Sequence, residues 1–328
     1  IFRRATLASV ITSTYPMIVV GCYFGITPWN MERLSIDESD LSYAILLFGI
    51  FFIISNQIAG RILVPKYGTK LVMTLAFPIV TFSALLTVIS SSYFYFLLTF
   101  ISGGIGWGAS GPIGGIHSQL IERHFKKIIT PYYAMGFNLG ILLGGGLAGL
   151  IMRNNYEPYI SFTILSFLSI LVSSFVYSYG LPRDLDFKGE GEKFKLPETN
   201  VLLFGFLLFF VFGSGGIIMD WSTLWLSKDL NAPLYLASMG LIFFSIGGIF
   251  ANLFSNSLIK LFTEKVVGCY FVMLGASIMF LSLLTNKFYI ILAVLSLYGF
   301  AIANLVPIVI RQAVKQSSES IPMTVTNL

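Results

Sequence analysis

The stretch Leu181-Pro-Arg-Asp-Leu-Asp-Phe-Lys-Gly-Glu-Gly-Glu-Lys-Phe-Lys195 carries charges of both signs and interrupts an otherwise apolar chain. Six long apolar runs precede this stretch and four follow it. At ~1.5 Å of rise per residue, roughly 20 apolar residues form a helix that crosses the ~30 Å hydrocarbon core of a bilayer. The pattern predicts a membrane protein with a solvated linker between two groups of helices.

The apolar runs are continuous and do not alternate with polar residues, which favours helices over a β-barrel. A hydrophobic content of 56%, only 11% charged residues and a mean hydropathy of +0.84 exclude an ordinary soluble domain. The fold class predicted is an all-α membrane protein. Its ten spans are expected at 6–28, 42–63, 71–91, 94–118, 131–152, 158–180, 201–225, 233–256, 266–286 and 289–310.

The distribution of lysine and arginine predicts the orientation, because these residues are retained preferentially on the cytoplasmic side. With the N-terminus in the cytoplasm, sixteen of the twenty basic residues are cytoplasmic, and Arg33, Arg153, Lys228 and Lys287 are the exceptions. The net charge of +5 follows from this sorting. A nucleic-acid partner is not expected, since that would need a basic patch on a soluble face.

The chain is expected to form an N-terminal six-helix bundle at 1–182, a charged cytoplasmic linker at 183–199 and a C-terminal four-helix bundle at 200–328. A short internal similarity supports two related halves. Gly25 to Leu34 and Gly216 to Leu226 both place a tryptophan four or five residues after glycine and a leucine five residues after tryptophan. Transporter folds built from parallel repeats have this kind of similarity. The alternative is that these tryptophans only mark the membrane interface.

Six helices, a charged linker and a second set of helices resemble the major facilitator superfamily (MFS). The loop from Ala59 to Lys70 resembles a glycine and basic signature of that family, although Pro65 stands where an acidic residue is usual. The resemblance implies that this loop takes part in conformational change. Its matching residues are Gly60, Arg61, Lys66, Gly68 and Lys70.

A bacterial branch of the superfamily is more similar still. Its features are tryptophan and arginine after helix 1, glutamate-arginine after helix 4, and Asp-Trp-Ser in helix 7. In this chain they are Trp29 and Arg33, Glu122 and Arg123, and Asp220, Trp221 and Ser222. The resemblance implies a multi-pass protein of the bacterial inner membrane. It also implies twelve helices, so the last two are expected to be missing here.

Asp220 is the sharpest candidate for a substrate or gating residue, because a carboxylate in a membrane helix is costly and usually faces a cavity or a partner. Trp221 and Ser222 are expected to lie on the same site. Arg33 could pair with Asp220 between the two bundles and hold the outer side closed. The alternatives are an aspartate near the headgroups and an arginine that reaches for the interface.

Further candidates are polar or aromatic residues within predicted helices. They are Trp107, His117, Asn138 and Asn304. Polar groups facing lipid are expensive, so these side chains are expected to face the bundle interior. Interhelical hydrogen bonds are the alternative role. Gly136, Gly140 and Gly144 recur every four residues, which predicts either tight packing or a smooth face for sliding.

These features predict a secondary active transporter that moves a small, neutral or weakly charged solute by alternating access. The partners expected are this solute and membrane lipid, and the residues leave the coupling ion open. A truncated, non-transporting remnant or a membrane partner protein is the alternative. An enzyme is not expected, because no Ser/Lys or paired-Asp constellation and no phosphate loop is present, and no metal or cofactor is expected either.

Overall fold

The computed structural model describes residues 1–127, 129–187, 198–318 and 321–327. Ten segments of these ranges are helical, long and apolar enough to cross a membrane, which confirms the predicted number of spans. The described ranges contain helices and no β-strand, so the all-α class is confirmed as well. Of the predicted linker at 183–199, the part at 188–197 lies outside the described residues.

We call α1 to α8 the N-terminal half and α9 to α16 the C-terminal half. The N-terminal half contains α1 (Phe2–Gly25), α2 (Thr27–Leu34), α3 (Glu38–Ile58), η1 (Ala59–Leu63), α4 (Val64–Tyr67), α5 (Thr69–Ile89), α6 (Tyr93–Phe125), α7 (Thr130–Arg153) and α8 (Pro158–Tyr179). The C-terminal half contains α9 (Thr199–Lys228), α10 (Leu234–Ala237), α11 (Met239–Leu253), α12 (Ser255–Lys265), η2 (Val266–Tyr270), α13 (Phe271–Ser282), α14 (Phe288–Ala303), α15 (Leu305–Gln316) and α16 (Ile321–Asn327).

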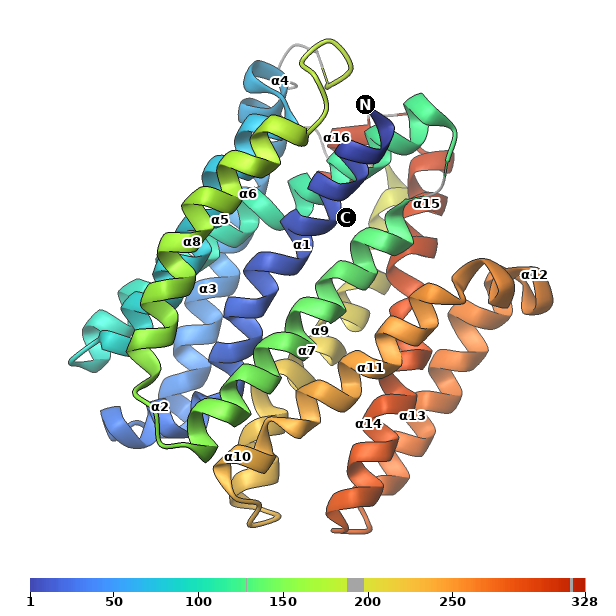
Figure 1. Ribbon diagram of the computed structural model, residues 1–328. Coiled ribbons are helices and arrows are strands. Elements are labelled where there is room, and N and C mark those ends of the chain that lie inside the picture. The colour runs from blue at the N-terminus through green and yellow to red at the C-terminus, as the bar shows by residue number, and fades with distance from the viewer. Residues whose placement is uncertain (128, 188–197, 319–320, 328) are drawn as a thin grey trace.

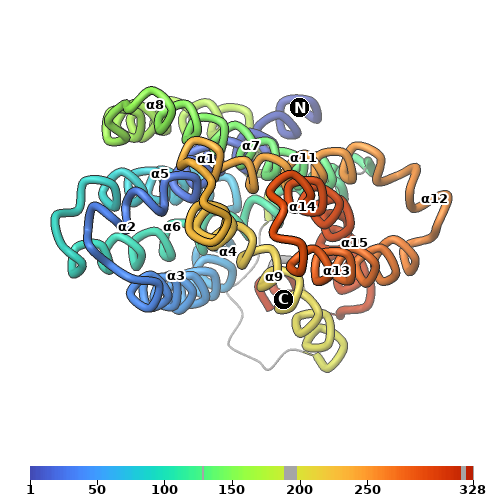
Figure 2. The backbone as a smooth tube through the Cα atoms, turned by 90° about the horizontal axis from the view of Figure 1, so that it is seen from below, coloured from blue at the N-terminus to red at the C-terminus, as the bar shows by residue number. Residues whose placement is uncertain are grey.

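The long helices run between two ends of the molecule (Figure 1). One end carries α2 and α10 and is called the α2 end. The other carries the N-terminus, α4 and α16 and is called the N-terminal end. Seen along this direction, α3, α5, α6 and α8 lie on one side and α12 to α15 lie on the other (Figure 2). Contacts between α7 and α11 join the two halves.

Glycines on two faces of α7 let it pack closely on both sides. A Cβ at Gly140 or Gly144 would overlap the backbone of α1, at Thr14 and Ile18 respectively. The repeat of glycine every four residues therefore packs α7 against α1, inside the N-terminal half. On the other face, a Cβ at Gly145 would lie 3.5 Å from the Cβ of Leu241 in α11. That second face, and not the regular repeat, meets the C-terminal half.

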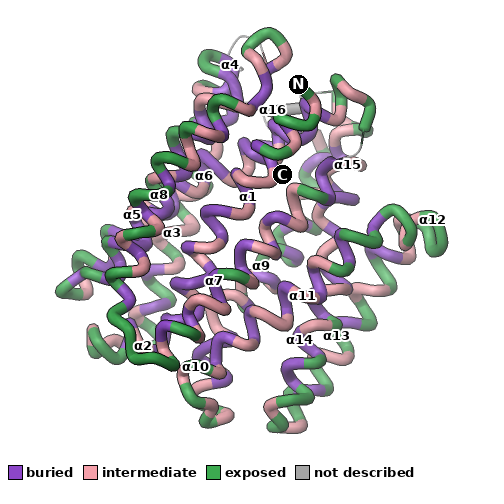
Figure 3. Tube along the Cα trace, viewed as in Figure 1, coloured by how far each residue is buried: buried purple, intermediate pink, exposed green. Residues whose placement is uncertain are grey.

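Burial differs among the spans as expected for helices with different exposure to lipid (Figure 3). In the most hydrophobic window of α1, 56% of the residues are buried, whereas the share is 28% in α9 and 22% in the α12 to α13 span. Side chains such as Phe209 and Leu284 are largely exposed. An exposed apolar surface of this kind is stable when lipid surrounds it.

Candidate functional site

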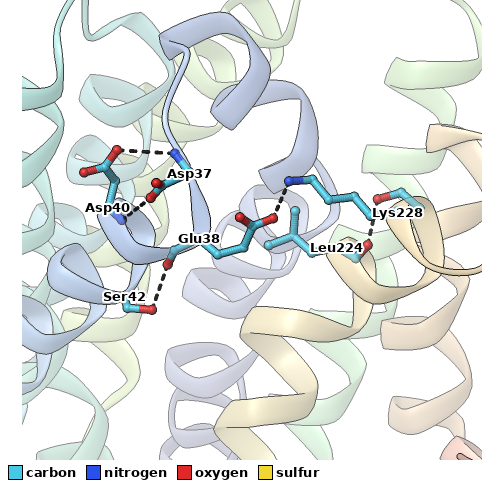
Figure 4. A network of polar contacts seen from close by, with 7 residues as sticks. Asp37, Glu38, Asp40, Ser42, Leu224 and Lys228 are labelled. Carbon is cyan, nitrogen blue, oxygen red and sulfur yellow. Dashed lines mark hydrogen bonds and ion pairs between the residues drawn. The ribbon is translucent and has the colours of Figure 1, made fainter.

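At the α2 end, an ion pair connects the two halves. Lys228, the last residue of α9, donates a hydrogen bond to the Glu38 carboxylate at the first residue of α3 (Figure 4). A capping box fixes where α3 begins, because Asp40 N donates to Asp37 Oδ1 over 2.9 Å and Asp37 N donates to Asp40 Oδ2 over 3.3 Å. The sequence therefore places Glu38 on a fixed helix start that faces the end of α9.

Apolar side chains form a seal beside this pair. Leu224 of α9 is 3% exposed and packs with Met31 of α2 and with Leu41 and Ala44 of α3. Trp221, one helical turn earlier, packs against the same cluster. Figure 4 shows Leu224 next to the Glu38–Lys228 pair. We call these five side chains the α2-end seal.

Arg33 and Trp29 act within the N-terminal half. The Arg33 guanidinium donates to Asn30 Oδ1 from Nε (3.2 Å) and Nη2 (2.8 Å), and to the carbonyl oxygens of Ser90 (2.6 Å) and Thr87 (3.3 Å). It also lies over the Trp29 ring, 5.4 Å from the centroid. Arg33 thus holds α2 against the end of α5. The structure describes both Arg33 and Asp220 and contains no ion pair between them.

Asp220 lies just inside the α2-end seal. It precedes Leu224 by four residues and Lys228 by eight, so the three side chains follow one another along one face of α9. Its Oδ2 lies over Gly216, 3.9 Å from where a Cβ at that residue would be. Among the described residues, none donates a hydrogen bond to this carboxylate. The Tyr23 hydroxyl of α1 lies beside the Asn30 side chain of α2.

The three residues of the predicted Asp-Trp-Ser motif point to different places. The Asp220 Oδ2 lies over Gly216 of its own helix, and Trp221 joins the α2-end seal. Ser222 is buried and faces Gly240 at the start of α11, within the C-terminal half. Trp221 therefore contacts the N-terminal half, whereas Ser222 contacts its own half.

Near the middle of the molecule, Trp107 of α6 occupies an apolar cluster formed by both halves. It packs against Met17 of α1, Ile141 of α7 and Leu241 of α11, and its ring centroid lies 6.2 Å from that of Phe137. Met219 of α9 completes the contact. The prediction that Trp107 faces the interior agrees with this placement.

Two predicted asparagines lie closer to the N-terminal end. Asn138 of α7 is buried against Gly248 of α11, so it lies on the contact between the halves. Asn304, between α14 and α15, donates from Nδ2 to the carbonyl oxygen of Ala251 over 3.0 Å. Its bond is therefore internal to the C-terminal half.

At the N-terminal end, α16 packs against the loop predicted to take part in conformational change. Arg61 donates to Gln57 Oε1 over 2.6 Å and to Asn327 Oδ1 over 2.5 Å. A Cβ at Gly60 would overlap the side chain of Thr326. Gly60 and Arg61 thus contact the C-terminal half directly.

The other residues of this loop interact with the segment after α8, with α8 itself and with one another. Asp186 accepts hydrogen bonds from the backbone N–H groups of Thr69 and Lys70, each over 3.1 Å, and so caps α5. Gly68 has φ +85°, and Lys70 Nζ lies 4.6 Å from the Tyr177 ring centroid. The Nζ of Lys66 lies 5.0 Å from the Tyr67 ring centroid.

His117 belongs to the same buried network as Asp186. Its Nδ1 lies 2.7 Å from Thr69 Oγ1, and its Nε2 faces the backbone N–H of Leu181 at 3.4 Å. Thr69 Oγ1 in turn donates to Asp186 Oδ1 over 2.7 Å. All these partners belong to the N-terminal half or to the segment after it. His117 therefore joins α6 to α5 and is not one of the side chains of the α2-end seal.

A family model described as the Major Facilitator Superfamily matches residues 8–324. The chain belongs to the Major Facilitator Superfamily. The resemblance seen in the sequence is thereby confirmed, and the chain is a multi-pass membrane protein of a transporter family.

Relatives of this MFS protein share its fold at low identity. An uncharacterized MFS-type transporter of Yersinia pestis is 22% identical over 305 residues, which cover 89% of this chain and 76% of the relative. A bacterial homolog of the human lysosomal transporter Spinster, solved in an inward-facing and unoccupied conformation, gives a TM-score of 0.70 at 14% identity, covering 99% of this chain and 78% of its own.

Two further solved MFS structures have different named solutes. The human organic anion transporter MFSD10 gives a TM-score of 0.71 at 15% identity, covering 99% of this chain and 88% of its own. The nucleoside transporter NupG gives a TM-score of 0.65 at 14% identity, covering 98% of this chain and 87% of its own. At such identities the likeness shows the fold alone.

The sequence analysis missed five residues that the structure places at these sites: Tyr23, Asn30, Glu38, Asp186 and Lys228. Two of them left a signal in the sequence. Lys228 is one of four basic residues that the predicted topology puts outside, and Glu38 follows Asp37 in an Asp-x-x-Asp capping pattern. The other three became visible only through their neighbours in space.

Proposed function

We propose that this MFS protein is a secondary active transporter, which moves a small neutral or weakly charged solute across the bacterial inner membrane by alternating access. In this proposal the bundles at 1–182 and 200–328 rock against each other, and the linker at 183–199 connects them on the cytoplasmic side. The N-terminus is cytoplasmic, so the α2 end faces outward.

The observation that carries this proposal is the α2-end seal with its ion pair. Alternating access requires contacts between the halves that form at one end and break in each cycle. The Glu38 and Lys228 side chains are 51% and 52% exposed, so their ion pair is weak and reversible. The seal beside it is apolar and compact. Together they close the outer side in this proposal, and the polar part of the closure is weak.

The charge distribution favours a neutral solute. Between its first residue Thr199 and Lys228 at its last, α9 has one charged residue, Asp220. The central cluster around Trp107 is apolar. An anionic solute would meet the Asp220 carboxylate, while the Arg33 guanidinium is already bonded to Asn30 and to the carbonyl oxygens of Thr87 and Ser90. Of the solved relatives, the one named for nucleosides fits this interior better than the one named for organic anions.

The experiment is uptake into proteoliposomes that contain the purified chain. The probes are radiolabelled uridine and D-glucose as neutral solutes, glucuronate as an anion and choline as a cation. We expect at least one neutral solute to enter several times faster than into empty liposomes. Faster uptake of glucuronate than of both neutral probes would contradict the proposed solute class. No uptake of any probe would favour the alternative, a non-transporting membrane partner.

Opening of the α2 end is tested in the same vesicles. The variant Glu38→Cys/Lys228→Cys, made with Cys269→Ser to remove the exposed thiol, can be joined across the halves by a bis-methanethiosulfonate cross-linker long enough to replace the two side chains. We expect cross-linking to stop uptake and reduction to restore it. The two single cysteine variants are the matched controls. Undiminished uptake by the cross-linked double variant would show that this end does not open during transport.

A further inference from the structure

The first residues after α8 are bound to the loop that precedes α5, and we call residues 181–187 the docked segment. Asp186 of this segment is 7% exposed and accepts four hydrogen bonds. The donors are the Thr69 hydroxyl (2.7 Å) and the backbone N–H groups of Thr69 (3.1 Å), Lys70 (3.1 Å) and Phe187 (2.8 Å). A carboxyl group surrounded by donors can only accept, so Asp186 is an ionised carboxylate here.

A second side chain of the docked segment holds the same loop. Arg183 Nη2 donates to the carbonyl oxygens of Pro65 over 3.3 Å and Lys66 over 3.2 Å. A Cβ at Gly68 would lie 2.7 Å from Arg183 Nη1 and 2.6 Å from Asp186 Oδ2. Both side chains of the docked segment therefore lie against Gly68, where the lack of a side chain leaves them room.

The hydrogen bonds around His117 show which ring nitrogen carries the proton. Thr69 has one hydroxyl proton and donates it to Asp186, so at the 2.7 Å contact between Thr69 Oγ1 and His117 Nδ1 the ring nitrogen is the donor. On the other side of the ring, Leu181 N–H donates to His117 Nε2 over 3.4 Å, and this nitrogen therefore has no proton. The pattern assigns a neutral imidazole with its proton on Nδ1.

A charged His117 would not fit these partners. An imidazolium has a proton on both nitrogens, so Nε2–H would face the backbone N–H of Leu181 and leave two buried donors opposed. Two described charged groups act on the ring electrostatically, Asp186 from the docked segment and Lys70 from α5. Their charges have opposite signs and act in opposite directions. The neutral ring is thus the form that its surroundings satisfy.

We propose that His117 is a positioning residue that, as the neutral imidazole protonated on Nδ1, joins α6 to both ends of the docked segment. One connection runs directly to Leu181, and the other runs through Thr69 to Asp186. This inference goes beyond the proposed transport function. It makes the docked segment a part of the N-terminal half that moves with α5 and α6, and it excludes His117 as the residue that takes up a coupling proton.

Nitrogen NMR measures where the proton lies. The chain has two histidines and His124 is exposed, so His124→Gln, purified without a histidine tag, leaves His117 as the only imidazole. In 15N-histidine-labelled protein in lipid vesicles we expect a protonated Nδ1 and an unprotonated Nε2, unchanged between about pH 8 and about pH 6, where an ordinary histidine titrates. His124 of the wild type should titrate over this range. A protonated Nε2, or an imidazolium at the lower pH, would overturn the proposal.

The link through Thr69 is tested in the same spectra. Thr69→Val removes the hydroxyl that accepts from Nδ1, and we expect the His117 proton to be shared between the two ring nitrogens. Thr81→Val is the matched control, because Thr81 is an equally buried threonine of α5 whose hydroxyl donates to Ser169 over 2.9 Å. It should leave the His117 signals unchanged. Signals of His117 that are the same in Thr69→Val and in the wild type would contradict the link.

Hydrogen exchange tests the docking itself. Asp186→Asn replaces a carboxylate oxygen by a donor, and we expect the backbone amides of Thr69 and Lys70 to exchange roughly tenfold faster or more, the value of one hydrogen bond. Asp229→Asn, at an exposed aspartate after α9, is the control and should not change these amides. Unchanged exchange in Asp186→Asn would show that Asp186 does not hold the segment. Neither measurement uses transport, so a chain that moves no solute would contradict the proposed function and not this inference.

Discussion

Lys228 donates a hydrogen bond to Glu38 across 190 residues of chain, and this contact joins the last residue of α9 to the first residue of α3. Both residues belong to helix ends, where a small rotation of one half moves them far. Leu224, one turn before Lys228, enters the apolar cluster of Met31 and Leu41. A weak polar contact on the surface therefore lies beside a buried apolar one. The two should contribute unequally to closing the α2 end.

Charge reversal tests the polar part. We expect Glu38→Lys or Lys228→Glu to lower the ratio of closed to open α2 ends by about fivefold, because an exposed pair is worth up to about 1 kcal/mol. The double reversal should restore the ratio. Spin labels at Ser39→Cys and Asp229→Cys, with Cys269→Ser, report the distance between the halves. A double reversal that stays open would show that the pair does not hold the end closed.

Removal of the apolar plug should have a larger effect. Leu224→Ala is expected to destabilise the closed state of the α2 end, relative to the open state, by about 2 kcal/mol or more, since Leu224 is 3% exposed and fills the seal. The same labels should then show mainly open molecules. Leu226→Ala is the matched control, because Leu226 is 0% exposed but packs inside the C-terminal half. It should lower the melting temperature without changing the distance, and equal opening by both variants would count against the seal.

The number of spans and the all-α fold were predictable because membrane crossing imposes a length and a composition on each helix. Ten apolar runs became ten helical spans, and the family resemblance was confirmed. Helix breaks were not predictable. The span Glu38–Tyr67 contains the π-helical turn η1, and α12 contains Thr263 with φ 68°. Such features depend on neighbouring helices more than on local composition.

Site residues were predictable in kind but not in pairing. Asp220 stood out because a carboxylate in an apolar run is costly. Its expected partner Arg33 is instead surrounded by Asn30 and two carbonyl oxygens, which only the packing of α2 on α5 brings together. His117 was equally conspicuous, yet it bonds to Thr69 within one half. Which polar residues meet is decided by helix rotation, and a single sequence does not reveal that rotation.

Gly68 gives a test of the loop between α4 and α5. It has φ +85° and ψ 160°, a region that residues with a Cβ rarely occupy, and a Cβ there would lie 2.6 Å from Asp186 Oδ2. We expect Gly68→Ala to destabilise the protein by about 1–3 kcal/mol and to lower its melting temperature in detergent. Gly49→Ala, in open space on α3, is the control and should be neutral or stabilising. An unchanged melting temperature in Gly68→Ala would mean that the loop relaxes freely.

The close contact of α7 with α1 predicts opposite effects at two nearby glycines. A Cβ at Gly144 would overlap the Ile18 carbonyl oxygen and lie 2.6 Å from the Cys22 nitrogen, whereas a Cβ at Gly146 would meet nothing within 4 Å. We expect Gly144→Ala to cost about 1–3 kcal/mol through overpacking, and Gly146→Ala to add up to about 1 kcal/mol of helix stability. Thermal unfolding of the two variants measures both.

The comparison also distinguishes two roles for glycine in α7. If Gly144 acts by packing, its alanine variant pushes α7 away from α1. In that case Gly144→Ala lowers the stability of the protein and Gly146→Ala does not. If the glycines serve only to keep α7 flexible, both substitutions stiffen the helix and change stability in the same direction. Opposite signs at Gly144 and Gly146 would therefore assign the four-residue repeat to helix contact inside the N-terminal half, and leave the motion between halves to the other face of α7, at Gly145.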